Sequence, residues 1–452
     1  MTECIESRLA FSSEGKREVV AEFNGGTISS DGGALLLRET DRRIKLLERF
    51  SQCFLDGRHP ALIEHRIEEM LAQRVYGLAM GYEDLNDHEQ LRHDPLLQVL
   101  AGKAEPGQEA LAGKSTLNRM ELGDGAPNRY KKITFWRDAI DALLVDVFLE
   151  AHSTAPEQIV LDIDTTDLAI HGEQEGRFYH GYYDRYCYLP LYVFAGEHVL
   201  CARLRPSHID PSAGSRKEIE RIVKQIRAAW PEVKIVLRGD SGFCREELMA
   251  WCEDNQLDYV FGLARNVRLE AMVADSLQEA RRQWEQMQQP ARVFTEFKHE
   301  TVSGTWSRKR RVVAKAEHID GKSNPRFIVT SLSEEAWAAR PLYEGLYCAR
   351  GDMENRIKEQ FVLFADRVSA ASMRANQLRL YLSAIAYALV CGLRRLGLQA
   401  THLANAQVGT IRVRLLKIGA QIRVTVRKIW IQMSSSFPLQ TLFRQALQQL
   451  RC

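Results

Sequence analysis

The stretch from Gln158 to Thr166 reads QIVLDIDTT, a short apolar run that ends in acidic and small polar residues. This pattern predicts a buried strand over residues 158–164. A carboxylate at the carboxyl edge of a buried sheet is costly unless a cation binds it. Asp164 closes the strand, so it is interpreted either as a turn former or as part of a cation site.

A second stretch, VLRGDSGFC at 236–244, has a similar arrangement. A strand predicted over 233–237 ends at Gly239-Asp240, and Ser241-Gly242 let the chain turn sharply. The stretch also contains Arg-Gly-Asp-Ser, the tetrapeptide that adhesion receptors read on extracellular proteins, and Arg-Gly-Asp recurs at 350–352. An intracellular chain would not meet such a receptor, so Asp240 is interpreted as a second strand-end carboxylate.

The predicted elements follow one another in the order of an RNase H-like α/β core, a mixed sheet with helices on its faces. Strands are predicted over 158–164, 186–195, 198–205, 233–237 and 259–264, with helices over 215–229 and 245–255. Because the first and fourth strands of such a sheet are neighbours, Asp164 and Asp240 should meet. Two like charges at short range invite a divalent metal ion.

The rest of the chain divides around this core, whose first part spans residues 151–265. Residues 1–150 are predicted to form a helical N-terminal domain, with helices over 61–79 and 128–149. Residues 266–333 are predicted to form a β-rich insertion, with a helix over 269–288 and strands over 293–299, 311–317 and 326–330. A core helix over 334–364 lies in segment 334–366, and 367–452 form a basic α+β region with a helix over 378–393 and a strand over 422–433.

Basic residues are concentrated at the C-terminal end of the sequence. Residues 367–452 contain thirteen Lys and Arg and no Asp or Glu, which leaves 48 basic against 59 acidic residues elsewhere. A one-signed segment of this length is typical of a surface that faces a polyanion, so nucleic acid is the expected partner. A merely solvated basic face is the alternative.

Composition also bears on the compartment. The nine cysteines form no CxxC pair, which is typical of reduced thiols in a cytosolic chain. The first twenty residues do not resemble a secretory signal. The longest apolar run, Leu380–Leu393, has about fourteen residues, fewer than the roughly 20 that cross a bilayer. We expect a soluble cytoplasmic protein without a membrane partner.

A third carboxylate is expected from a later helix. The stretch 347–359 reads YCARGDMENRIKE, in which Arg350, Glu354 and Lys358 are spaced four apart and share one helical face. Tyr347 lies about one turn earlier on that helix. A solvated salt-bridge stripe is the alternative interpretation of this pattern.

At these positions the sequence resembles a known family. The carrying motifs are Asp164-Thr165-Thr166, Arg238-Gly239-Asp240-Ser241-Gly242-Phe243 and Tyr347-x-x-Arg350-x-x-x-Glu354. They resemble the DDE motifs of bacterial insertion-sequence transposases, in the group with a β-strand insertion between the second Asp and the Glu. More narrowly, Asp31-Gly32-Gly33, His180-Gly181-Tyr182-Tyr183 and Glu354-Asn355-Arg356-Ile357-Lys358-Glu359 resemble insertion-sequence family thirteen-eighty.

The resemblance implies a set of site residues. Asp164, Asp240 and Glu354 would bind two divalent metal ions, normally Mg²⁺, with Mn²⁺ as a substitute. Tyr347 and Arg350 would contact DNA phosphate near the cleaved bond. The family pattern has a Lys seven residues after the Glu, where this chain has Phe361. Lys358, one turn earlier on the same face, is the candidate replacement.

The resemblance also implies an activity. The chain would be a DNA transposase that cleaves insertion-sequence ends and joins their 3′-hydroxyls to target DNA. The N-terminal domain would recognise the terminal inverted repeats, and the enzyme would act on double-stranded DNA as a homodimer or a larger assembly in a bacterial cytoplasm, associated with the nucleoid. A metal-dependent nuclease without strand transfer, and an inactive transposase-derived DNA-binding protein, are the alternatives.

Several residues compete with these assignments. Asp162 and Asp167 are alternatives to Asp164, and Asp352 and Glu359 are alternatives to Glu354. The histidines His171, His180 and His208 lack the paired spacing of a zinc site. Residues 107–115 imitate a phosphate-binding loop but have five residues between the glycines rather than four. The aromatic run between Phe178 and Tyr188 is typical of core and loop packing, with stacking on an unpaired base as the alternative.

Overall fold

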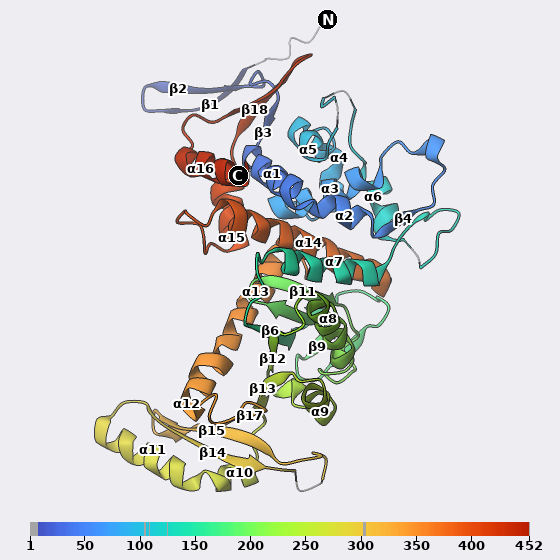
Figure 1. Cartoon of the computed structure of the whole chain (residues 1–452). Coiled ribbons are helices and arrows are strands. Elements are labelled where there is room, and N and C mark those ends of the chain that lie inside the picture. Colours follow the sequence, from blue (N-terminus) through green and yellow to red (C-terminus); the bar gives the residue numbers. More distant parts are fainter. Residues whose placement is uncertain (1–7, 104, 108, 124, 302–303, 452) are drawn as a thin grey trace, which may run out of the picture. The chain divides into compact units, whose positions relative to one another are not determined.

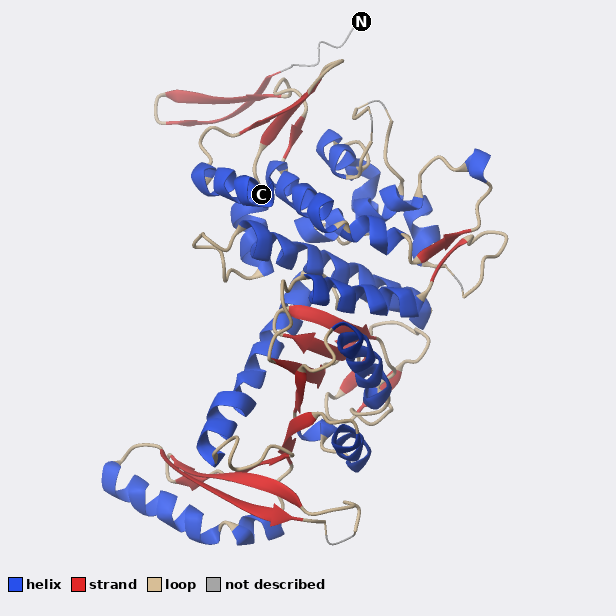
Figure 2. Ribbon diagram, viewed as in Figure 1, coloured by secondary structure: helices blue, strands red, loops and turns tan. Residues whose placement is uncertain are grey.

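The computed structural model describes residues 8–451 apart from 104, 108, 124, 302 and 303. The chain forms two compact units, each with helices and strands (Figure 2). One unit comprises the chain up to Gln52 together with Asp56–Met120 and the part from Leu389 onward. The other comprises Cys53–Leu55 and Glu121–Ala388, and it contains every predicted site residue. The domain boundaries predicted from the sequence do not coincide with these units, and they stay a prediction.

The first unit is mainly helical. Its helices are α1 (Leu35–Ile44), α2 (Leu46–Ser51), α3 (Ile67–Met80), α4 (His88–Leu91), α5 (Pro95–Leu100), α6 (Lys114–Glu121), α15 (Val408–Ile411) and α16 (Gln440–Arg451). Strand β18 (Ala420–Val424) pairs with both β3 (Ile28–Ser29) and β19 (Ile429–Met433), and β1 (Arg8–Glu14) pairs with β2 (Arg17–Glu22). The single strand predicted over 422–433 is wrong, because the chain reverses between Val424 and Ile429 to form a hairpin.

The second unit is built on a nine-stranded mixed sheet (Figure 1). Its strands are β6 (Gln158–Thr165), β10 (Leu191–Ala195), β11 (His198–Arg203), β12 (Lys234–Gly239), β13 (Asp258–Leu263), β14 (Ala291–His299), β15 (Arg310–Ile319), β16 (Lys322–Ser323) and β17 (Arg326–Thr330). The order is β11-β10-β6-β12-β13-β17-β15-β14, with β16 paired to β15. β6, β12 and β13 run parallel, and β10 runs antiparallel to β6 and β11. The predicted neighbouring of the Asp164 and Asp240 strands is therefore confirmed.

The segment predicted as a β-rich insertion extends this same sheet. Its strand β17 pairs with β13 on one side and with β15 on the other. Backbone hydrogen bonds therefore continue from β13 into the strands of the insertion. Helices α10 (Val267–Met272) and α11 (Ala274–Met287) replace the single helix predicted over 269–288.

Side chains alternate between the two faces of the sheet. On one face Leu161, Ile163 and Leu237 join a core with α8 (Ser215–Ala229) and α9 (Glu246–Asp254). On the other face Val236 and Val260 join a core with Leu342, Tyr343 and Leu346. Because residues of one strand alternate, Asp162 and Asp164 belong to this second face. Helices α8 and α9 lie on one side of the strands in Figure 1, and α13 (Gly351–Val362) lies on the other.

Three predicted elements are broken by local chemistry. The strand predicted over 186–195 is two strands in different sheets, β9 (Arg185–Tyr188) and β10, because Pro190 between them has no N–H to donate. The helix predicted over 128–149 begins only at Arg137, as α7 (Arg137–Glu150), because Ile133–Phe135 form the strand β5. The helix predicted over 334–364 is irregular within Leu342–Arg350, where π-helical and 3₁₀ turns replace the α-helix. Gly345 lies inside this stretch and Gly351 directly follows it, and glycine is a poor helix former.

Helix α14 (Met373–Gly397) is longer than the predicted 378–393. By length and composition it is the one helix in the described part of the chain that could cross a membrane. However, 89% of its most apolar window is buried inside the protein, which is the pattern of a core helix.

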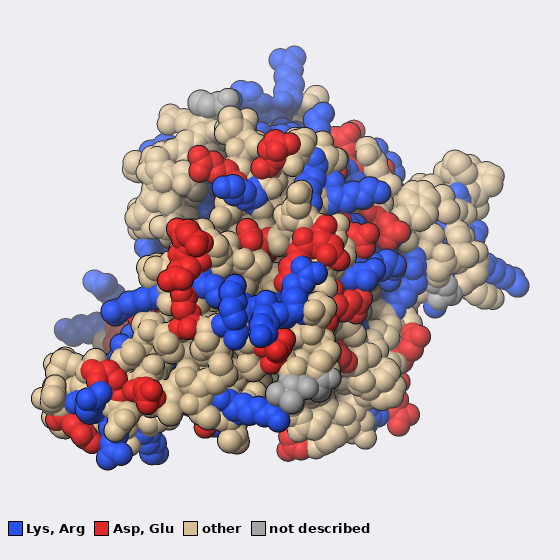
Figure 3. Space-filling view, turned by 60° about the horizontal axis from the view of Figure 1, so that its bottom comes forward, with Lys and Arg blue, Asp and Glu red and all other residues tan. Residues whose placement is uncertain are grey.

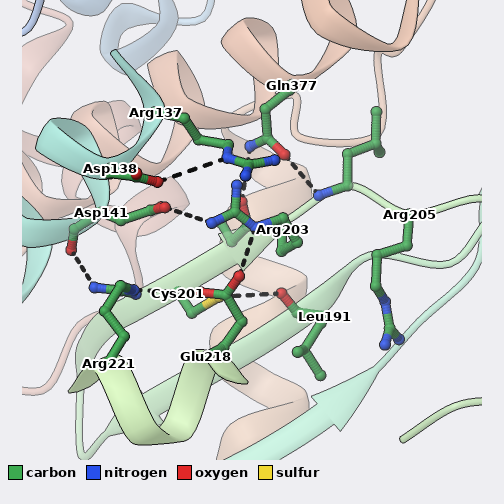
Figure 4. A network of polar contacts seen from close by, with 12 residues as sticks. Arg137, Asp138, Asp141, Leu191, Cys201, Arg203, Arg205, Glu218, Arg221 and Gln377 are labelled. Atoms are coloured by element: carbon green, nitrogen blue, oxygen red, sulfur yellow. Dashed lines mark hydrogen bonds and ion pairs between the residues drawn. The ribbon is translucent and has the colours of Figure 1, made fainter. Parts of the chain in front are cut away.

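A buried polar network fastens helices to the edge strand β11 (Figure 4). Arg203 Nε donates to Glu218 Oε1 of α8 at 2.9 Å, and Arg203 also pairs with Asp141 of α7. Tyr381 of α14 donates its hydroxyl to Asp141 Oδ1 at 2.7 Å. Removing one partner of such a pair leaves an uncompensated buried charge, so this network stabilises the unit as a set.

Candidate active site

Asp164 lies near the carboxyl end of β6, and its side chain is 13% exposed. The backbone N–H of Thr165 donates to its Oδ1 at 2.8 Å. Arg350 Nη1 lies 3.1 Å from the other oxygen, Oδ2. Asp164 is thus a nearly buried carboxylate with a single cationic partner.

Asp240 follows directly after β12, the parallel neighbour of β6. Gly239 pairs with Ile163 in the register of these strands, so Asp240 and Asp164 occupy the next position of each chain. The N–H of Gly242 donates to Asp240 Oδ1 at 2.8 Å and begins a short 3₁₀ turn. This turn holds the carboxylate at the sheet edge, beside Asp164.

Glu354 comes from helix α13, in the first turn. Arg350 Nη2 lies 3.5 Å from Glu354 Oε1, four residues later on the chain, so Arg350 is close to carboxylates from two separate elements. The Glu354 side chain is 53% exposed, far more than that of Asp164. Lys358 is exposed one turn further along α13.

The pKa of Asp164 reflects its burial and the two neighbouring carboxylates. Burial, together with the Asp240 carboxylate, raises the pKa of Asp164 to about 6. Arg350 opposes this increase, whereas Glu354 adds to it. A carboxylate whose pKa is raised by like charges is one that an added cation would stabilise.

Tyr347 lies in the irregular turn before α13, and its hydroxyl reaches the central strands. A Cβ added at Gly262 of β13 would lie 2.6 Å from Tyr347 Oη and 2.9 Å from the backbone nitrogen of Ser241. Only a glycine at this position leaves room for the hydroxyl beside the Asp240 turn. Burial raises the pKa of Tyr347, so the phenol stays protonated at neutral pH.

A second acidic residue of β6 has a different environment. Asp162 accepts from Arg238 Nε at 2.5 Å and from Arg238 Nη2 at 2.7 Å. Arg238 Nη1 also donates to the carbonyl of Leu346, immediately before Tyr347. The arginine of the Arg-Gly-Asp-Ser stretch therefore joins β12 to β6 and to the turn that carries Tyr347.

The carboxylates have the right chemistry for a hard cation, because Mg²⁺ and Mn²⁺ prefer carboxylate oxygens. Within the described residues, no three Asp, Glu, His or Cys side chains are gathered closely enough to form a complete metal site. Arg350 supplies positive charge between Asp164 and Glu354 instead. Asp164, Asp240 and Glu354 all supply carboxylate oxygens, so the donor set fits a divalent ion by chemistry.

Most predicted site residues are brought together. Asp164, Asp240, Tyr347, Arg350 and Glu354 surround one edge of the sheet, and Lys358 is on the same helix without a contact that links it to them in the described structure. Among the competitors, Asp162 is bound to Arg238. Glu359 is buried and pairs with Arg356 at 2.8 Å, while Asp352 is exposed.

The sequence motifs contain Arg238 and Tyr183 without giving them a role, and no motif contains Gly262. The pKa of Tyr183 is raised to about 12 by burial, with Asp167 and Asp164 adding to the increase, so its phenol lies close to the site. Strand alternation could have identified Arg238, because it shares a strand face with Asp240.

Charged side chains of the insertion are arranged differently. Arg310 pairs with Glu246 and Glu253, and Arg311 pairs with Glu296. All of these except Glu246 line a cavity of about 520 Å³. In the view of Figure 3, basic side chains mostly have acidic neighbours.

Comparison with known proteins identifies a family. No curated protein matches the chain. A solved structure, the cryo-EM structure of the piggyBac transposase synaptic complex with hairpin DNA, is similar with a TM-score of 0.40 and 12% identity, over 86% of this chain and 80% of that one. This likeness is too distant to assign a fold or a function. The family described as Transposase DDE domain group 1 matches residues 11–452. The chain therefore belongs to the Transposase DDE domain group 1 family.

Proposed function

We propose that this transposase cleaves the ends of an insertion sequence and joins the resulting 3′-hydroxyls to target DNA, with Asp164, Asp240 and Glu354 as its catalytic carboxylates. One observation carries the assignment. Two parallel neighbouring strands bring Asp164 and Asp240 to one sheet edge, where Arg350 links Asp164 to Glu354. Mg²⁺, or Mn²⁺ in its place, is the proposed cofactor.

The reaction uses the same chemical step twice, the attack of an oxygen nucleophile on the phosphorus of a phosphodiester. In the first use, a water oxygen attacks the phosphorus at the element end, the bond from phosphorus to the 3′-oxygen breaks, and that oxygen takes a proton. In the second, the freed 3′-hydroxyl attacks a phosphodiester of target DNA, losing its proton as the target's phosphorus–oxygen bond breaks. Divalent ions held by the three carboxylates would activate the attacking oxygen and neutralise the leaving one.

The chain's own residues would divide the remaining work. Asp164 must be ionised to act as a ligand, and its pKa of about 6 allows this at neutral pH. Arg350 and the neutral Tyr347 hydroxyl are proposed to bind the phosphate next to the cut bond, because both lie beside the carboxylates. Lys358 is proposed to contact a phosphate further from the bond, since it is exposed on the same helix.

The finer fold assignment is also a proposal. The order β11-β10-β6-β12-β13, with its mixture of antiparallel and parallel pairs, supports an RNase H-like core that the insertion extends. We further propose that the chain acts on terminal inverted repeats as a homodimer or larger assembly in a bacterial cytoplasm. Membership of insertion-sequence family thirteen-eighty rests on the short motifs alone.

The test uses the full chain with Mg²⁺ and labelled DNA ends, taken from inverted repeats that bracket the gene. The wild type should give cleaved ends and strand-transfer product, and Asp240→Asn or Glu354→Gln should lose both. Asp352→Asn is the matched control, since Asp352 is exposed on the same helix turn as Glu354. It should keep nearly full activity.

Each other outcome has a clear meaning. Nicking without strand transfer would indicate a nuclease, and DNA binding without any cutting would indicate an inactive DNA-binding protein. Full cleavage by Glu354→Gln would show that the carboxylate assignment is wrong. An equal loss of cleavage in Asp352→Asn would favour the alternative carboxylate Asp352 or a helix turn that tolerates no substitution, and would remove the support that Glu354→Gln gives.

A further inference from the structure

A two-stranded arm extends from the mainly helical unit. It comprises β18, β19 and the turn between them, residues 420–433, and we call it the β arm. At its base Ala420 and Gln421 pair with β3. Beyond Ile422, the described strands of the β arm pair only with each other. Figure 1 shows the β arm in red, reaching past the helices of its unit.

The apolar side chains of the β arm lose their cover toward its tip. Ile422 near the base is 6% exposed, whereas Val424 and its cross-strand partner Ile429 are 44% and 41% exposed. Val426, at the tip, has its side chain fully exposed. Because an apolar side chain contributes to folding only when it is removed from water, Val426 adds nothing to the stability of the isolated chain.

Val426 also departs from the usual chemistry of a tight turn. The Thr425 N–H donates to the Lys428 carbonyl at 2.9 Å, and the Lys428 N–H donates back to the Thr425 carbonyl at 3.3 Å. Val426 and Arg427 are therefore the two residues of a hairpin loop, at positions where Gly, Asn and Asp are favoured. A residue that breaks such a local rule without a gain in packing is expected at a functional site.

Positive charge surrounds this apolar tip. Arg423, Arg427 and Lys428 are the charged residues of the β arm, which contains no Asp or Glu. All three are exposed, and none of them is paired with a carboxylate in the described part of the chain. The Lys428 ammonium lies 5.2 Å from the centroid of the exposed Trp430 ring. Cations of one sign on a projecting ribbon fit a polyanion.

We propose that the tip of the β arm enters the minor groove of duplex DNA, where Val426 wedges into a base step while Arg427 and Lys428 bind the flanking phosphates. The inference rests on the proposed function, which makes DNA the partner, and it adds the groove, the contacting residues and a bend in the DNA. Apolar side chains that enter a base step from the minor groove unstack it and kink the duplex. Phosphate contacts by the two cations would offset part of the cost of unstacking.

A protein partner fits the tip less well. The β arm borders a groove of about 960 Å³, whose apolar lining includes Val424, Ile429 and Pro95 and whose polar lining includes Glu105 and Lys428. An apolar segment of a second chain placed there would remove water from Lys428 without neutralising its charge. A duplex that meets the tip neutralises the same charge with phosphate, so DNA is the favoured partner.

The experiment measures DNA bending without cleavage. The full chain is mixed, in EDTA, with a short duplex element end that has a central A·T-rich segment and carries a fluorescent donor at one end and an acceptor at the other. The wild type should raise the energy transfer, as expected for a bend of about 20–90°. Val426→Ser should still bind the duplex but leave it nearly straight. The minor-groove ligand netropsin should abolish bending by the wild type.

The salt dependence of binding tests the two cations. The double variant Arg427→Gln and Lys428→Gln should lower the slope of log K against log salt concentration by about 1.8, because each phosphate contact contributes about 0.9. An unchanged slope would show that neither side chain binds a phosphate, and would overturn that part of the proposal.

Two further valine substitutions serve as controls. Val413→Ser removes a valine of the same unit that is 68% exposed, and this variant should bend the duplex as the wild type does. Val426→Leu keeps an apolar wedge and should also bend it. Thermal unfolding of each variant reports whether the fold is intact.

The outcomes separate this inference from the proposed function. A straight duplex with the wild type, full bending by Val426→Ser, or bending that netropsin leaves unchanged would overturn the wedge even if the wild type cleaves DNA. A dimer in solution that Val426→Ser dissociates, with DNA bending unchanged, would show that the tip binds a second copy instead. If the wild type bends DNA as described but never cleaves it, the catalytic proposal alone fails.

Discussion

Asp162 and Asp164 lie two residues apart on one strand, share a face of the sheet and each have an arginine partner, yet their environments differ. Asp162 makes two short hydrogen bonds with Arg238, which in turn binds the Leu346 carbonyl. Asp164 has one contact with Arg350 at 3.1 Å and two further carboxylates near it. In the Asp162–Arg238 pair both carboxylate oxygens are bound by the guanidinium, whereas around the Asp164–Arg350 pair negative charge is in excess.

The difference separates a closed structural ion pair from a carboxylate with unbalanced negative charge around it. Burial raises the pKa of Asp162 as well, but the fork of Arg238 matches both of its oxygens. The excess negative charge at Asp164 weakens the fold, and a bound cation would offset this cost. Breaking the Asp164–Arg350 pair should therefore raise the stability of the fold, whereas breaking the Asp162–Arg238 pair should lower it.

The largest effect on DNA cleavage is expected for the substitution Asp164→Asn. Cleavage should fall by about 10²–10³-fold or more, on the scale of losing one group that stabilises the transition state. At pH 7 the variant should nevertheless be about 1–3 kcal/mol more stable, because a raised acid pKa means that the ionised form weakens the fold. Between pH 6 and pH 4 this advantage should disappear, since the native wild type takes up the proton there. Cleavage assays at pH 7, and unfolding of the variant and the wild type at pH 7 and pH 4, test this prediction. A variant less stable than the wild type at pH 7 would contradict it.

Asp162→Asn should act in the other direction, because the buried Arg238 guanidinium would keep its charge without its partner, which costs more than burying the ionised Asp162 carboxylate does. Removing one partner of a buried ion pair leaves Arg238 unpaired, with an expected loss of about 3–5 kcal/mol in the free energy of unfolding. Asp162→Leu combined with Arg238→Met should recover most of that loss, because no buried charge remains. Denaturant unfolding measures both variants, with the exposed Asp352→Asn as control. Equal stability of Asp162→Asn and wild type would show that the pair is not structural.

Gly262→Ala should affect the site without removing a charge. The added Cβ would meet the Tyr347 hydroxyl at 2.6 Å and the Ser241 backbone, so Tyr347 must move. Cleavage should fall by about 10- to 100-fold, as a displacement of about 1 Å at a site can cost on that order. Gly345→Ala, in the same helical turn as Tyr347, has open space around its Cβ and serves as the matched control. Unchanged cleavage in Gly262→Ala would mean that Tyr347 is not needed where it lies.

The smallest expected effect concerns pH in the wild type. Because the pKa of Asp164 is about 6, the ionised fraction of this carboxyl falls about tenfold for each pH unit well below 6. Cleavage at limiting Mg²⁺ should decline in the same way, and saturating Mg²⁺ should shift the decline to lower pH because the ion competes with the proton. A profile that stays flat from pH 7 to pH 5 would argue against Asp164 as a ligand.

Much of this comparison could be predicted from the sequence. The strands of Asp164 and Asp240 are short, apolar and bounded by turn residues, so their order and the meeting of the two carboxylates follow from local patterns. The pairing of Asp162 with Arg238 could not be predicted, because it depends on register between strands 76 positions apart. The irregular turns at Leu342–Arg350 were also missed, since they depend on how Tyr343 and Leu346 fit the sheet rather than on helix propensity.

The continuity of the sheet limits how this transposase can be shortened. Strand β13 is paired over Val260–Leu263 with β17, a strand of the insertion. Deleting residues 266–333 would leave Val260 and Phe261, both fully buried, on a strand with bare backbone donors and acceptors. Such an edge pairs readily with other chains. The product of that deletion should therefore be an aggregating protein rather than a minimal catalytic domain.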